Sequence, residues 1–198
     1  MRTPRLLLCL SLTLCMGWLA ADASAAGVTG NGPHAMTGVK NIILSNSAGE
    51  QVNIGTVTFA DAGNARSSFT VAIAPEFGEY FLAMRPFRCL AGKTQQLCWF
   101  PVNREPQVIS ATDLVPLEYA LMFMRTKPAS LHLNPFNGVY YKMAWSDEGL
   151  TGTVQDVDMD PFITPDAVPL ERRVRPLRPQ DLSPGDPRSH WLPTLTIR

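Results

Sequence analysis

The sequence lacks the marks of a nucleic-acid binder or of a common hydrolase. Its 17 lysines and arginines balance 17 aspartates and glutamates, so no excess of positive charge steers it toward a polyanion. Its three histidines are scattered. It has no G-x-S-x-G elbow, no C-x-x-C redox pair and no internal repeat at a solenoid or propeller period. We therefore expect a non-catalytic protein that uses no cofactor and binds no nucleic acid.

Long apolar runs are also missing, except at the start of the chain. Arg2 and Arg5 precede an apolar run over residues 6–19 that is shorter than the roughly 20 residues a membrane span needs. This order is typical of a secretory signal peptide over residues 1–26, with an uncleaved anchor as the alternative. We expect cleavage after one of three small residues: Ala23, Ala25 or Ala26. The mature chain would be periplasmic or secreted, with no transmembrane segment.

The remaining chain suits a single domain with flexible ends. Residues 27–38 are rich in glycine and predict a flexible lead-in. Residues 39–160 contain several short runs in which apolar and polar residues alternate, which predicts one β domain. Residues 161–198 hold eight prolines, which cannot donate to a strand ladder, so this tail is predicted to be an extended or disordered arm.

Cysteine is scarce, and its placement marks the most informative stretch, residues 79–102. Two apolar runs flank a polar loop over residues 91–96, and each run carries one cysteine, which predicts a hairpin. Two of the four cysteines lie in the signal segment, so the mature chain keeps Cys89 and Cys98. We predict a disulfide between them, because exported proteins oxidise their thiols; two free buried thiols or half of a metal site are the alternatives.

Alternation elsewhere predicts an all-β fold, an antiparallel sandwich or small open barrel of hairpins. A change of phase around Gly55 predicts a β-bulge. Residues 118–124 fit either helix or strand, and we favour one helical turn followed by a strand. Residues 139–145 and 150–157 predict a second hairpin closed by a turn at residues 146–149.

Two charged clusters are candidate sites. Asp156, Asp158 and Asp160 alternate along the chain and offer oxygen ligands to calcium, although Pro161 breaks the pattern of a calcium loop. A strand end with its polar side in water is the favoured alternative. Four arginines of the tail form a basic cluster that could dock on the acidic stretch before it, bind an anionic partner such as a phospholipid headgroup, or stay solvated: Arg172, Arg173, Arg175 and Arg178.

Several short motifs, RPFRCL, LCWF, DLVPLEYALMF, NGVYY and DMDP, lie between residues 79 and 161. In these motifs the sequence resembles a group of exported bacterial proteins that have no assigned function. The resemblance implies export and no particular activity, cofactor or catalytic residue.

Two functional classes remain. The first is a protein–protein interaction module of the cell envelope, of the inhibitor, immunity or envelope-assembly type. The second is a binder of a small apolar ligand or lipid inside a β-sandwich or barrel, because the chain is rich in Met, Phe and Tyr. Core packing accounts for these side chains without a ligand, so the first class is favoured.

Overall fold

A computed structural model describes residues 35–102, 106–160 and 177–198. The predicted signal peptide and most of the lead-in lie outside these residues. The elements, in chain order, are β1 (Gly38–Ser45), β2 (Gln51–Asp61), β3 (Arg66–Ile73), β4 (Gly78–Leu82), β5 (Arg85–Ala91), β6 (Gln96–Trp99), β7 (Val108–Ser110), α1 (Val115–Ala120), β8 (Phe123–Thr126), η1 (Pro135–Asn137), β9 (Gly138–Ser146), β10 (Gly149–Val157), η3 (Pro179–Asp181), β11 (Leu182–Pro184) and β12 (Thr194–Ile197).

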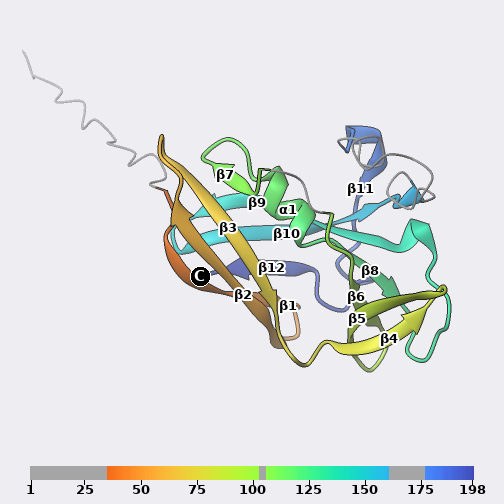
Figure 1. Cartoon of the computed structure of the whole chain (residues 1–198). Coiled ribbons are helices and arrows are strands. Elements are labelled where there is room, and N and C mark those ends of the chain that lie inside the picture. The colour runs from red at the N-terminus through yellow and green to blue at the C-terminus, as the bar shows by residue number, and fades with distance from the viewer. Residues whose placement is uncertain (1–34, 103–105, 161–176) are drawn as a thin grey trace, which may run out of the picture. The chain divides into compact units, whose positions relative to one another are not determined.

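The prediction of an all-β fold is confirmed. In the part of the chain that the structure describes, twelve strands form one antiparallel sheet, in the order β4-β5-β6-β8-β9-β10-β12-β1-β2-β3-β7, with β11 paired to β10 (Figure 1). The sheet path is open, because β4 and β7 stand at its two ends. Most strands that are neighbours in the sheet are also consecutive along the chain, as expected for hairpins joined by short turns.

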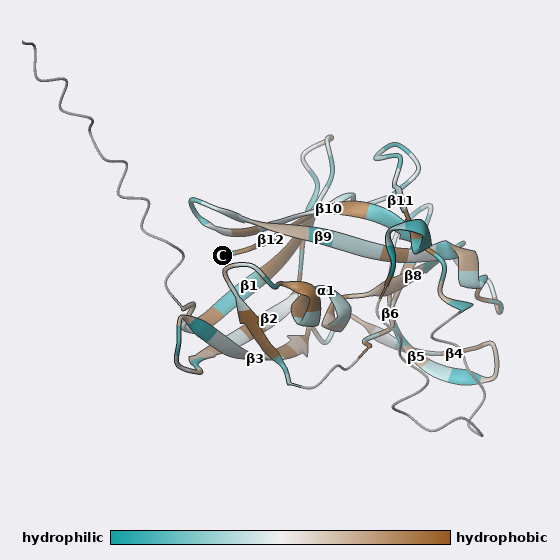
Figure 2. Ribbon diagram, turned by 90° about the horizontal axis from the view of Figure 1, so that it is seen from above, coloured by the Kyte–Doolittle hydropathy of each residue, from teal (hydrophilic) through white to brown (hydrophobic). Residues whose placement is uncertain are grey.

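One main hydrophobic core contains residues from strands along most of the sheet path, including its β7 end. It contains fully buried residues of β1 and β12, such as Ile42 and Leu195, together with Ile109 of β7 and Leu117 of α1. Helix α1 contacts both β7 and β9 and carries apolar residues (Figure 2). The sheet therefore wraps around a filled core, and α1 lies between β7 and a central strand.

The β-bulge predicted near Gly55 is present. Ile42 of β1 faces Gly55 and Ile43 faces Asn53, so Ile54 is the extra residue of β2. Gly55 has a φ of +145°, and a Cβ atom there would lie 2.1 Å from the Ala72 carbonyl oxygen. Only glycine fits this close approach of two backbones.

The second predicted hairpin is also present. β9 and β10 pair from Gly138↔Val157 to Ser146↔Gly149. Residues 118–124 divide as expected: α1 ends at Ala120, and β8 begins at Phe123.

The prediction that residues 161–198 form a tail outside the sheet is wrong for their last part. β12 pairs with both β1 and β10, and its Leu195 and Ile197 are fully buried. Pro193 is the last proline, and the four residues after it alternate and keep all their backbone donors. The first and the last strand of the described residues thus pair with each other inside the sheet. Among the described residues, no helix is long and apolar enough to span a membrane.

Candidate interaction surface

A tight reversal at Ala83 and Met84 shapes the end of the molecule near the disulfide. The predicted first arm of the hairpin over residues 79–102 is in fact two strands, because β4 turns back into β5 with Leu82 opposite Arg85. Ala83 and Met84 have φ values of +46° and +64°. Two-residue hairpin loops need such angles, which residues other than Gly, Asn and Asp adopt at a cost of about 1–3 kcal/mol each. The turn therefore holds a conformation that its own residues disfavour.

This reversal places apolar side chains in solvent. The exposed fractions are 62% for Phe81, 83% for Met84 and 70% for Leu131. The Ala83 amide donates a hydrogen bond to the Leu131 carbonyl oxygen at 3.1 Å, so the β4–β5 turn and the segment around Leu131 are adjacent. We call Phe81, Met84 and Leu131 the apolar tip. Clustered exposed apolar side chains are typical of interaction sites, whereas isolated ones need no explanation.

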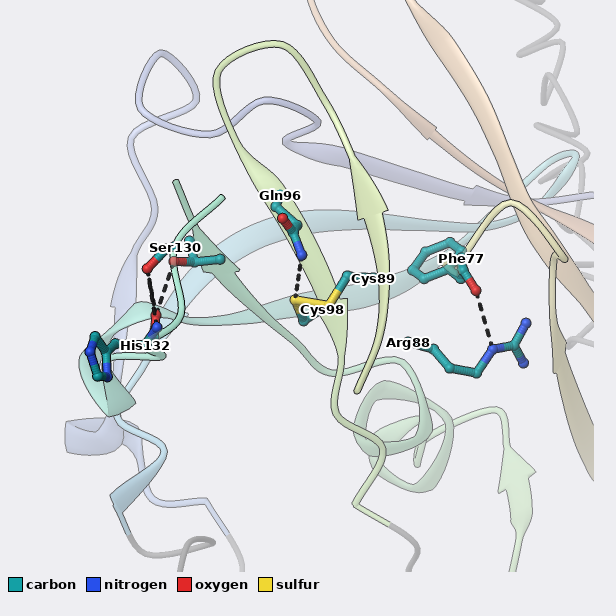
Figure 3. The surroundings of a disulfide bond; sticks show 8 residues. Phe77, Arg88, Cys89, Gln96, Cys98, Ser130 and His132 are labelled. Carbon is teal, nitrogen blue, oxygen red and sulfur yellow. Dashed lines mark hydrogen bonds between the residues drawn. A yellow bond between two sulfur atoms is a disulfide. The ribbon is translucent and has the colours of Figure 1, made fainter. Parts of the chain in front are cut away.

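The disulfide supports the base of the apolar tip. Cys89 and Cys98 are bonded, as predicted, and face each other across the pairing of β5 with β6 (Figure 3). Both are buried with Leu82 in a small cluster, against which Leu133 packs. Leu82, next to Phe81, and Leu133, close to Leu131, therefore pack on the same disulfide-bonded cluster.

Arg88 of β5 links the disulfide-bonded strands to the segment that precedes β4. It donates to the Phe77 carbonyl oxygen at 3.5 Å, as Figure 3 shows. It also donates to the Ala74 carbonyl oxygen at 3.0 Å. These bonds hold β5 to the segment that leads into β4.

Charged side chains border the apolar tip. Residues 80–102 and 119–146 contain no aspartate or glutamate, and each range holds three lysines or arginines. Arg85, next to Met84, and Lys127, near Leu131, are both exposed. Glu79, two residues before Phe81 on β4, is also exposed, so the border of the apolar tip carries charges of both signs.

The three candidate calcium ligands do not converge in the structure. Asp156 Oδ1 lies 3.3 Å from Arg125 and 3.1 Å from His190 Nε2. Asp158 instead accepts a hydrogen bond from the Asp160 amide at 2.9 Å. Among the residues described, no three His, Cys, Asp or Glu side chains are grouped as metal ligands would be.

The arginine cluster is only partly described. Arg172, Arg173 and Arg175 lie outside the described residues. Arg178 forms an ion pair with Asp181 at 3.2 Å in the first turn of η3.

Sequence reasoning missed a buried carboxylate, Glu118 of α1, whose side chain is fully buried. It accepts hydrogen bonds from the Tyr140 hydroxyl and, at 2.7 Å, from the Met143 amide, and Lys142 Nζ lies 3.2 Å away. Burial, reinforced by the neighbouring carboxylate, raises the pKa of Tyr140, which remains a neutral donor. The sequence signal that could have revealed it is that Glu118 is the single charged residue of the apolar run EYALMFM.

His190 was also missed. Its imidazole is 3% exposed and lies beside Asp156 in the segment that leads into β12. Burial lowers the pKa of His190, although Asp156 opposes the shift. Nearby, the Trp191 amide donates to Gln95 Oε1 at 3.1 Å, so the same segment contacts the loop that the disulfide closes.

Comparison with protein families, with curated proteins and with solved structures finds no match. The resemblance to exported bacterial proteins is neither supported nor contradicted by this result and stays a prediction. Function has to be argued from the surface itself.

Proposed function

We propose that this protein is an exported, non-catalytic interaction module that binds a protein partner through the apolar tip. The carrying observation is that Phe81, Met84 and Leu131 are exposed on two adjacent segments that a disulfide-bonded cluster supports. A backbone held on a disulfide-bonded base loses little conformational entropy on binding. The strained turn at residues 83–84 adds support, because such strain gathers at functional positions.

The chemistry of the tip suggests what the partner presents. Phe81 and Met84 would fill an apolar pocket, and Arg85 and Lys127 would meet carboxylates at its rim. Such a division between an apolar centre and a charged rim is typical of protein interfaces. An inhibitor, an immunity protein or an envelope-assembly factor would each use a surface of this kind, in the periplasm or outside the cell.

The first test is native mass spectrometry of the protein purified from its own cell envelope. A second polypeptide in stoichiometric amount is expected. Extra mass that is too small for a polypeptide, with no protein partner, would contradict the proposal.

The tip itself is tested by variants. Because hot-spot residues contribute more than about 1 kcal/mol each, Phe81→Ser with Met84→Ser should weaken partner binding at least tenfold. The matched control is Val39→Ser, which removes another exposed apolar side chain, 65% exposed, from β1. Both proteins should melt at the temperature of the wild type. Equal binding by the tip variant and the control would show that the partner binds elsewhere.

A further inference from the structure

A groove of about 830 Å³ lies beside α1 and includes residues of β7, β9, β10 and the segment around η3. Val108 and Val115 contribute half-buried apolar lining, and the buried Tyr119 and Tyr140 border it. Lys142 also faces it. This volume falls in the range of about 300–1,000 Å³ that is usual for small-molecule sites. The groove shares no residue with the apolar tip, so the proposed partner binding does not account for it.

Lys142 is placed by the buried carboxylate behind it. Its Nζ lies 3.2 Å from one oxygen of Glu118 and 3.3 Å from the other, while its own side chain is 55% exposed. Glu118 is already satisfied by the Tyr140 hydroxyl and the Met143 amide. An ammonium group has three donors, so Lys142 can keep its contact with Glu118 and still donate to a ligand.

The other charged residues of the groove are of both signs. Asp113, a carboxylate of the lining, already accepts the Val115 amide at 3.1 Å. Arg178 is paired with Asp181. Arg66, a second cation of the lining, forms no ion pair within the described part of the chain. The groove therefore holds two cations, Lys142 and Arg66, beside its apolar lining, with the carboxylates of Glu118 and Asp113 nearby.

We propose that this groove binds a free aliphatic carboxylate, with the chain against the tyrosines and valines and the carboxylate at Lys142. A long aliphatic chain matches the apolar lining, and a single negative head group matches Lys142. No covalent step is involved, and the site acts independently of the partner surface at the apolar tip.

Titration calorimetry of the full mature chain tests this site with three probes: dodecanoate below its critical micelle concentration, dodecanol below its solubility limit, and acetate. Dodecanoate should bind at least tenfold more tightly than dodecanol, which has the same chain but no charge. Acetate, the head group alone, should show no measurable binding. Equal affinity for dodecanoate and dodecanol, or no binding of either, would overturn the proposal.

Variants locate the head group. Lys142→Met should weaken dodecanoate binding about 10- to 100-fold, because hydrogen bonds to charged groups contribute about 1.5–3 kcal/mol. Lys142→Arg should keep most of the affinity, and Lys127→Met, which removes an exposed lysine outside the groove, should keep all of it. Unchanged affinity in Lys142→Met would overturn the assignment.

A second variant covers the case in which Lys142→Met fails to fold. Gln155→Trp places an aromatic ring in the groove without removing a charge, and it should abolish dodecanoate binding. The Phe81→Ser, Met84→Ser protein should bind dodecanoate like the wild type. Failure of this site would therefore be distinct from failure of the apolar tip.

Discussion

Replacing Glu118 by alanine should destabilise the protein more than any surface substitution. The change removes a fully buried carboxylate and leaves the Tyr140 hydroxyl and the Met143 amide buried without an acceptor. Each of the two unsatisfied buried donors costs about 1–3 kcal/mol, so we expect a loss of about 2–6 kcal/mol in the free energy of unfolding. Typical domains have about 5–15 kcal/mol in total, so the variant would be marginal.

Chemical denaturation followed by tryptophan fluorescence measures this loss. Glu118→Gln keeps the shape and one oxygen acceptor and should lose less than the alanine variant. Glu76→Ala, at an exposed position, is the matched control and should change stability by no more than about 0.5 kcal/mol. A loss below about 1 kcal/mol in Glu118→Ala would refute the view that this carboxylate ties α1 to β9.

Three further predictions concern the disulfide, the buried histidine and the last strand. Replacing Cys89 and Cys98 by alanine opens a link with a sequence separation of 9 and should lower the free energy of unfolding by about 2.6 kcal/mol, measured by urea denaturation; no change would contradict a stabilising bond. Because burial lowers the pKa of His190, the unfolded chain binds more protons than the folded one near this pKa. The free energy of unfolding should therefore fall as the pH drops below about 6.5. His190→Gln should flatten this part of the pH profile of the melting temperature. Leu195→Ala should cost about 2–5 kcal/mol, whereas a wild-type melting temperature would contradict its place in the core.

Local patterns predicted the hairpins because each depends on neighbouring residues. The alternation in β9 and β10 with the glycine-containing turn between them, and the spacing of Cys89 and Cys98, are visible within short windows of sequence. The bulge at Gly55 was visible for the same reason. All of these depend on contacts close in sequence.

Long-range pairing could not be predicted in the same way. β12 joins the sheet by pairing with β1 from the other end of the chain, and the prolines before it indicated a tail without strands. Nor does Ala83-Met84 carry the glycine or asparagine that marks a two-residue turn. The apolar run therefore predicts a single strand there, and the exposed tip is not visible in the sequence.

The candidate site depended on this missed reversal. The two polar sites predicted from the sequence are not where the candidate site lies. In the predicted calcium site, Asp156 pairs with other charged groups. In the predicted basic cluster, three of the four arginines lie outside the described residues. Exposure of an apolar side chain is a property of the folded surface, so sequence periodicity alone does not report it.

The most direct test of the proposed function is site-specific photo-cross-linking in intact cells. A photoreactive phenylalanine analogue at position 84 should give one discrete adduct with a second polypeptide, and the same analogue at position 39 on β1 should not. The adduct should disappear when Phe81 is changed to serine in the same protein. Equal adducts from positions 84 and 39, or an adduct from neither, would contradict an interaction surface at the apolar tip.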